Sequence, residues 1–289
     1  MWLPLLLAGG PATAWERLAH EAVTRTALRA LPPSSRAVLG PWEEELARRC
    51  MEPDDEAGTI PGERERHFLD LEAFGFPEPD LTKVPGPLTL TPDAARALLQ
   101  QALDPGFPRD RARTGVLPEA ARSQQRALSA ALRAGDDAAA RRHAVFLIHY
   151  VADAHQPLHA TTRYNGIDAF QRGVHGAFEG DLVARCPGAR PRYAAAVPAA
   201  EAEGAAVVLT ALLEGHPLAT TVLAADLGCP WTGKPPRPRC RAVPRARANA
   251  GVLACTHLEV IARERLERAA GRAARLLHAA WEEARAPAR

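Results

Sequence analysis

The sequence has 289 residues, of which 47% are hydrophobic and 24% charged, and its formal net charge is +2. A chain of this length can bury one large core, and its composition argues against an intrinsically disordered protein. The nearly balanced charge offers no electrostatic support for tight binding to a nucleic-acid duplex. Ala, Leu, Arg and Glu recur throughout and favour packed helices over a sheet sandwich. We therefore expect an all-α fold, a single-domain multi-helix bundle.

The first fourteen residues, MWLPLLLAGGPATA, predict a cleaved signal peptide. Their apolar run reaches Ala-Thr-Ala at residues 12–14, which has the small-x-small form of a signal-peptidase site. The run lacks a basic start and is too short to span a bilayer, and a buried N-terminal segment is the alternative. Cleavage would make Trp15 the N-terminus of a secreted or periplasmic domain over residues 15–289, without a transmembrane segment.

Apolar residues that return every three and four positions predict the helices. The predicted helices cover residues 17–31, 36–50, 92–104, 118–134, 137–156, 171–186, 199–214 and 256–285. Prolines and glycines mark two long irregular stretches, 51–91 and 215–250, the first with one short ordered element at HFLDLE. No internal repeat or low-complexity linker marks a domain boundary.

The cysteines lack the tight spacing of a cysteine zinc site. They are Cys50, Cys186, Cys229, Cys240 and Cys255. In an oxidising compartment Cys229 and Cys240 could close the short loop between them with a disulfide bond. Five reduced, buried cysteines are the alternative.

The segment AVFLIHYVADAHQPLHA carries the clearest chemical pattern. His149 and Asp153 are four residues apart on a predicted helix, so both project from one face and can bind one metal ion. Pro157 should end this helix near Gln156, which leaves His159 on the following turn. A lone histidine in an apolar helix is usually a core residue, but burying a carboxylate beside it without a partner is costly. The pair therefore favours a metal site.

Further histidines and carboxylates repeat this pattern elsewhere in the chain. His175 and Glu179 are again four residues apart, and His67 is followed three residues later by Asp70. Asp54 or Asp55 in an acidic loop, together with Trp15 and His20 near the expected mature N-terminus, completes the candidate set. Two such pairs with His159 between them indicate a multi-metal carboxylate–histidine site.

The other histidines are given no catalytic role. His155 points away from the pair on its helix, and we interpret it as structural or as a support for the ligands. The remaining four have no carboxylate at ligand spacing apart from ordinary surface neighbours. They are His143, His216, His257 and His278.

Five spaced elements over residues 15–185 resemble the zinc-dependent nuclease and bacterial zinc phospholipase C superfamily. In order, they are Trp15-x4-His20, Pro53-Asp54, His67-x2-Asp70, His149-x3-Asp153-x5-His159 and His175-x3-Glu179. The HQPLH string resembles the branch of single-strand-specific nucleases. Glu179 and the short gap that precedes His175 look more like the phospholipase branch.

The resemblance implies a trinuclear zinc cleft between the helices. The expected ligands are Asp54, His67, His149 and Asp153 for one Zn²⁺ ion, His159, His175 and Glu179 for a second, and Trp15, His20 and the shared Asp153 for a third. Asp70 matches a carboxylate that orients the attacking water in the nucleases. Phe68 matches an aromatic side chain that stacks on a base, and an ordinary core role is the alternative.

The implied function is zinc-dependent hydrolysis of phosphodiesters by metal-activated water. The expected enzyme is an endonuclease or nucleotidase that acts on single-stranded nucleic acid or nucleotides. One alternative is a phospholipase C that recognises phospholipid head groups, and another is a helical protein with structural zinc only. Structural sites are usually closed by four protein ligands, whereas one of the implied sets has three, which favours catalysis. The sequence indicates no protein partner.

Overall fold

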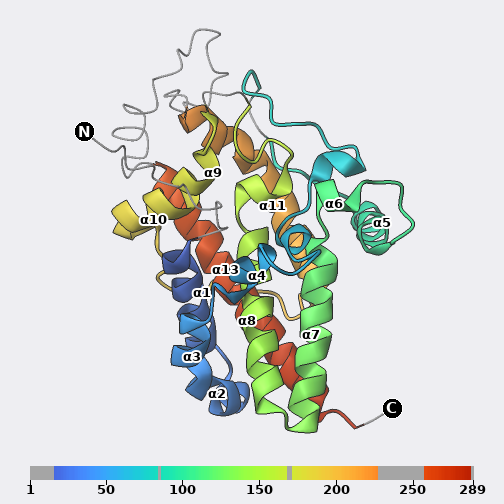
Figure 1. Ribbon diagram of the computed structural model, residues 1–289, viewed down its shortest axis with the longest axis vertical. Helices are drawn as coiled ribbons and strands as arrows, with labels where there is room; N and C mark the ends of the chain where they lie inside the picture. The colour runs from blue at the N-terminus through green and yellow to red at the C-terminus, as the bar shows by residue number, and fades with distance from the viewer. Residues whose placement is uncertain (1–15, 84–85, 168–170, 227–256, 288–289) are drawn as a thin grey trace, which may run out of the picture.

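The computed structural model describes residues 16–83, 86–167, 171–226 and 257–287. Within these residues the chain forms helices and turns and no strand, which confirms the expected all-α class (Figure 1). The longer helices are α1 (Arg17–Arg29), α5 (Pro92–Leu103), α7 (Leu117–Ala134), α8 (Asp137–Ala154), α11 (Gly204–Asp226) and α13 (His257–Arg285). The shorter α-helices are α2 (Pro33–Leu39), α3 (Glu43–Arg48), α4 (Glu52–Ala57), α6 (Arg111–Thr114), α9 (Val174–Gly176) and α10 (Leu182–Arg185).

Single helical turns of other types connect these helices. The 3₁₀ turns are η1 (Gly40–Trp42), η2 (Arg64–His67), η3 (Leu71–Phe74), η4 (Pro157–Ala160) and η7 (Pro187–Ala189). A π-helical turn, η6 (Ala177–Asp181), joins α9 to α10 and contains Glu179. Such turns are rare and are found often at functional sites.

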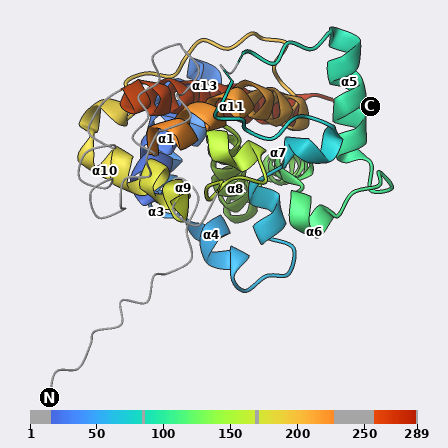
Figure 2. The same cartoon turned by 90° about the horizontal axis from the view of Figure 1, so that it is seen from above.

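Helix α8 is the centre of the molecule. Its residues from Ala144 to Ala154 are all buried, so it lacks the polar face of a surface helix. Helix α7 runs antiparallel beside it, and α13 crosses α1, α7 and α8 (Figures 1 and 2). Helix α11 packs against α7, α8 and the η4 turn that follows α8. The two polar residues near the end of this apolar helix, His149 and Asp153, are therefore carried into the protein interior.

Local sequence explains where α7 and α8 begin and end. Gly135 ends α7 in a left-handed conformation (φ 70°), which glycine adopts without a steric penalty. Asp136 then caps α8, because its side chain accepts a hydrogen bond from the amide of Ala139 at 3.0 Å. Pro157 follows the C-terminal end of α8 and starts η4, as the sequence predicts.

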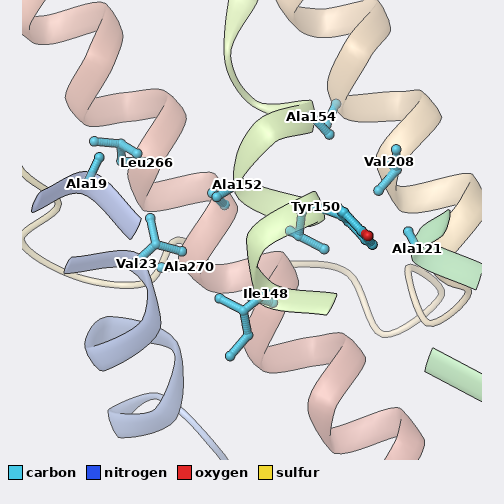
Figure 3. Packing of buried hydrophobic residues seen from close by; sticks show 14 of the residues in the cluster. Ala19, Val23, Ala121, Ile148, Tyr150, Ala152, Ala154, Val208, Leu266 and Ala270 are labelled. Atoms are coloured by element: carbon cyan, nitrogen blue, oxygen red, sulfur yellow. The ribbon is translucent and has the colours of Figure 1, made fainter. Parts of the chain in front are cut away.

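Small side chains let the central helices approach closely. Figure 3 shows Ala19 and Val23 of α1 facing Leu266 and Ala270 of α13, with α8 beside them. Tyr150 projects from the opposite side of α8 and is fully buried. This packing holds the N-terminal helix, which carries His20, against the helix that carries His149.

Two predicted helices are interrupted. The helix expected over 36–50 is divided into α2, η1 and α3, because Pro41 removes a backbone donor after Gly40. The helix expected over 171–186 begins at Val174 and passes through the π-helical turn before α10. The stretch 51–91 is more ordered than expected, since α4, η2 and η3 lie within it.

Helix α11 differs most from its prediction. It begins at Gly204 and continues through Pro217 to Asp226, so the expected end at residue 214 and the irregular stretch after it are wrong over these residues. Hydrophobic packing holds the helix together across the backbone donor that proline lacks. By length and composition it is the one described helix that could cross a membrane, but 67% of its most apolar window is buried in the protein. A core helix accounts for that composition.

Candidate metal centre

Histidines and carboxylates from six parts of the chain come together at the C-terminal end of α8. These parts are α1, α4, η2, α8 itself, η4 and the segment of α9 and η6. Figures 1 and 2 show α1, α4 and α9 around this end of α8. The side chains form three groups in which the ligand atoms lie within 4.8 Å of one another. The groups are His20, His149 and Asp153; Asp54, His67 and His149; and His159, His175 and Glu179.

The first pair of groups shares one buried centre. His67 Nδ1 lies 3.2 Å from His149 Nε2 and 2.9 Å from Asp153 Oδ2. His149 Nε2 lies 3.3 Å from the same Asp153 oxygen. Asp54 faces both rings, with Oδ1 at 3.5 Å from His67 Nδ1 and Oδ2 at 3.7 Å from His149 Nε2. His67 and His149 therefore face both carboxylates.

The other oxygen of Asp153 faces a different histidine. His20 Nε2 of α1 lies 3.5 Å from Asp153 Oδ1, and the His20 ring stacks on His149 with centroids 3.9 Å apart. Asp153 thus presents one oxygen to His67 and His149 and the other to His20. A carboxylate that faces two groups in this way can bridge two metal ions.

The third group lies beyond the end of α8. His159 Nε2 is 3.0 Å from His175 Nε2 and 3.2 Å from Glu179 Oε1. His175 Nε2 lies 2.5 Å from the same oxygen. All three side chains are buried. Among the described residues this group has three ligands, so a bound ion would keep a position for another ligand.

These distances are compatible with metal coordination as well as with hydrogen bonding. Two ligands of a tetrahedral zinc ion, at about 2.0–2.1 Å from the metal, lie about 3.3 Å apart, which resembles the separations in all three groups. Asp54 Oδ2 and Glu179 Oε2 are buried and accept no hydrogen bond. Buried carboxylate oxygens without a partner are costly, and a cation would satisfy them.

Backbone carbonyls orient the histidine rings. His149 Nδ1 donates to the carbonyl of Cys50 at 2.8 Å, and His159 Nδ1 donates to the carbonyl of His67 at 2.7 Å. Each bond places the proton on Nδ1 and leaves the Nε2 lone pair directed at the centre. Metal-binding histidines are commonly held by such bonds.

The electrostatics of the centre favour a bound positive charge. Burial alone would raise the pKa of Asp153, but the charge of His149 and hydrogen bonds from His149, His20 and His67 hold it well below its usual range. Burial alone would lower the pKa of His149, but Asp153 and Asp54 raise it to about 9. In the third group burial opposes ionisation of Glu179, while His175 and His159 keep its pKa at about 2. Protons and metal ions would therefore compete for these sites.

Asp70 and Phe68 flank the centre on the segment that carries His67. Asp70 is buried, and burial raises its pKa to about 7, with a further contribution from the charge of Glu72. Phe68 is half-buried, and its carbonyl accepts from the amide of Leu117 at 3.2 Å. Gly115 lies against it with φ 80°, where a Cβ atom would meet the Phe68 carbonyl oxygen at 2.0 Å. Only glycine fits this approach.

Other candidate residues belong to none of the groups or lie outside the described residues. Asp55 is exposed and belongs to none of the groups, so Asp54 is the residue of this acidic stretch, helix α4, that faces the centre. Trp15 lies outside the described residues, as do Cys229, Cys240 and Cys255. His155 is buried away from the groups, where its Nε2 lies 3.1 Å from Arg272 Nη1.

The four histidines without an assigned role lie outside the groups as far as the structure describes them. His143 pairs with Gln124, His216 lies 3.4 Å from Glu72, and His278 contacts Ser35. The side chain of His257 is outside the described part of the chain.

Sequence reasoning missed two supporting residues. Buried Glu63 hydrogen-bonds the hydroxyl of Tyr150 and lies 3.8 Å from His67 Nε2. Gln156 donates to Glu179 Oε1 at 2.6 Å, and its side-chain oxygen accepts from the amide of Leu158. The four-residue spacing of Glu63 and His67 was a visible signal, whereas the contact of Gln156 with Glu179 depends on the fold.

Comparison with known proteins does not assign this chain to a family. No protein-family model matches the chain, and no curated protein is significantly similar to it. Metal binding therefore rests on the arrangement of the three side-chain groups, and the family resemblance on its five spaced motifs.

Proposed function

We propose that this chain is a zinc-dependent phosphodiester hydrolase, and that it is an endonuclease or nucleotidase acting on single-stranded nucleic acid. The observation that carries the proposal is the position of Asp153, whose two oxygens face two different groups of histidines. Closely spaced metal ions joined by a carboxylate are typical of enzymes that hydrolyse phosphate esters. We further propose one secreted or periplasmic domain with a trinuclear zinc cleft.

The donor set suits zinc. Each group combines imidazole nitrogens with carboxylate oxygens, and none of them contains a cysteine among the described residues. The proposed ligands are Asp54, His67, His149 and Asp153 for one ion, His159, His175 and Glu179 for a second, and Trp15, His20 and Asp153 for a third. When bound, zinc supplies Lewis acidity toward a phosphoryl oxygen and toward water.

The remaining roles belong to the chain itself. Asp70 has a pKa of about 7, so its carboxyl can accept a proton from water or orient it near neutral pH. A bound cation would lower this pKa and favour the ionised, accepting form. Phe68, directly after His67 in the chain, offers a half-buried ring on which a base can stack. The carbonyls of Cys50 and His67 keep the histidine rings oriented throughout the reaction.

The number of ligands in the third group favours a catalytic role for the metal over a structural one. Structural zinc is normally enclosed by four protein ligands, whereas His159, His175 and Glu179 are three. A position for water or substrate would remain. The second candidate function, phospholipase C activity, is favoured by Glu179 and by the short gap between His159 and His175, which resemble that branch of the superfamily.

Parallel assays test the proposal. Zinc-loaded protein should cleave single-stranded DNA faster than it hydrolyses phosphatidylcholine, lose activity when a chelator removes the metal, and regain it with zinc. His159→Ala should abolish the activity, while His143→Gln, on α8 but outside every group, should retain it. Preference for phosphatidylcholine would favour the second candidate. Bound zinc without turnover of any phosphodiester would favour structural metal.

A further inference from the structure

A cavity of about 520 Å³ lies between the segment before His67 and the first turns of α7. Its lining includes the side chains of Arg66, Arg111, Arg122 and Arg126 and a single acidic residue, Glu119. A volume of this size accommodates a small organic ligand. The cavity therefore combines space with an excess of positive charge.

The four arginines are neutralised unequally. Arg66 pairs with Glu63 at 3.2 Å, and Arg111 pairs with Glu119 at 2.5 Å. Neither Arg122 nor Arg126 has a carboxylate within 4.0 Å in the part of the chain that the structure describes. These two are four residues apart on α7, where like charges repel. An anion in the cavity would relieve this repulsion.

Guanidinium groups match phosphate in both shape and charge. Each presents a planar set of N–H donors that can bind two phosphate oxygens together. Several guanidiniums around one cavity raise the local concentration of anions. A phosphate group is therefore the ligand that the lining fits.

The cavity and the metal centre are built on the same segment. Arg66 directly precedes His67, and the amide of Val116 in the cavity wall donates to the carbonyl of Glu65 at 2.6 Å. Because α7 and α8 are antiparallel, the start of α7 lies beside the end of α8 that carries Asp153 (Figure 1). A ligand in the cavity would thus be at the same end of the molecule as the metal ligands.

We infer that this cavity binds a backbone phosphate of a single-stranded nucleic acid while another phosphate of the same strand lies at the metal centre. The inference rests on the proposed function and narrows its substrate. A nucleic-acid strand repeats its phosphates and can fill both places. A phosphatidylcholine molecule has one phosphate, so it cannot.

Binding to metal-free protein tests the cavity separately from catalysis. Fluorescence anisotropy of a labelled oligothymidylate is measured in excess chelator for the wild type, for Arg122→Gln/Arg126→Gln, and for Arg48→Gln/Arg96→Gln. The last pair removes the same charge from exposed arginines outside the cavity. We expect the cavity variant to bind the oligonucleotide about tenfold more weakly. The slope of the log of the association constant against the log of the salt concentration should become less steep by about 1.4. The control pair should change both values much less.

Turnover of zinc-loaded protein gives a second readout. The ratio of kcat/KM for the oligonucleotide to that for a small phosphodiester should fall about tenfold in the cavity variant, mainly through KM. Circular dichroism and thermal unfolding show whether the variant is folded. Helix α7 packs on α8, so two changes on α7 could unfold the protein. In that case the single variant Arg126→Gln provides the same comparison.

Different failures have different meanings. If no phosphodiester is cleaved but oligonucleotide binding still depends on Arg122 and Arg126, the proposed function fails and the cavity remains a phosphate site. Equal losses in the cavity and control variants would overturn the inference, because they indicate a general charge effect. The inference would also be overturned if the cavity variant lost binding to phosphatidylcholine vesicles or to an acidic peptide but bound the oligonucleotide as well as the wild type does.

Discussion

At the residue scale, Asp153 has a position that no other carboxylate of the centre shares. One of its oxygens faces His67 and His149, and the other faces His20 of a different helix. Glu179 instead belongs to one group only. Loss of the Asp153 charge should therefore affect two proposed ions, and loss of the Glu179 charge one.

We predict that Asp153→Asn removes about two zinc ions per chain and Glu179→Gln about one, since an amide is a poor zinc ligand. Zinc per chain is measured by elemental analysis after dialysis against metal-free buffer. Asp137→Asn makes the same chemical change on the exposed first turn of α8 and should retain the wild-type content. Equal losses in the first two variants would mean that Asp153 does not bridge.

Gln156 supports the third group without belonging to it. Its amide donates to Glu179 Oε1 and fixes the carboxylate that faces His159 and His175. We predict that Gln156→Leu weakens zinc binding at this group about 10- to 100-fold, as loss of such supporting bonds usually does. Competition with a chromophoric zinc chelator measures the affinity. Gln124→Leu, a buried amide bonded to His143, is the control, and a comparable loss there would contradict the prediction.

At the scale of the elements, α11 and α13 are joined by a cluster of charges. Glu214 of α11 lies 2.8 Å from Arg272 and 3.1 Å from Arg265, both on α13. Arg265 also donates to the carbonyls of His155 and Ala211. Breaking a partly buried network of this kind is costly because it leaves a charge without its partner.

The pKa of Glu214 gives this network a testable pH dependence. Burial opposes its ionisation, but hydrogen bonding to Arg272 and the charges of the neighbouring arginines lower its pKa to about 2. Since the folded-state pKa is below the unfolded value of about 4.3, the stabilisation is complete above that value and is lost as the pH falls toward 2.

Glu214→Gln should therefore lower the free energy of unfolding by about 2 kcal/mol at pH 7. The difference from the wild type should shrink as the pH falls from about 4 toward 2, because the carboxylate is protonated first in the unfolded chain and then in the folded protein, and Gln lacks its charge at every pH. Urea unfolding at a series of pH values measures it. Glu282→Gln removes a carboxylate that is 53% exposed and 3.8 Å from Arg275, and should cost less than about 0.5 kcal/mol. A difference for Glu214→Gln that stays constant with pH would refute the assignment.

At the scale of the whole molecule, the candidate metal centre lies where separate parts of the chain meet. Its ligands come from α1, α4, η2, α8, η4 and the segment of α9 and η6. Any ion bound there would hold these parts together in the folded state and not in the unfolded chain. Metal binding should therefore stabilise the fold.

We predict that removal of zinc lowers the Tm, because the buried carboxylates then lose their cations. At a free zinc concentration about 100 times the Kd, the stabilisation by one site is about 2.7 kcal/mol. Differential scanning calorimetry with chelator, with added zinc and with added magnesium measures the shift, and zinc should restore the Tm far better than magnesium. Asp153→Asn should respond less than the wild type. An identical Tm with and without zinc would contradict the centre.

The sequence alone was sufficient for the features that depend on neighbouring residues. Helical periodicity predicted α1, α5, α7, α8 and α13 closely, and Gly135 and Asp136 fall at the predicted boundary between residues 118–134 and 137–156. The four-residue spacing placed His149 with Asp153 and His175 with Glu179, because residues at this distance share one face of a helix. These relations are set within a few residues of chain.

The tertiary structure decided which distant residues meet. It brings His20 and His67 to Asp153 and selects Asp54 over its neighbour Asp55, since helix packing determines which side chain turns inward. It also carries α11 through Pro217, where burial of an apolar helix outweighs one missing hydrogen bond. Arg66 is more than fifty residues from Arg122 and Arg126 in the sequence. These arginines line one cavity only because α7 packs beside η2. Contacts of this kind depend on the packing of the whole core, which no local pattern of residues encodes.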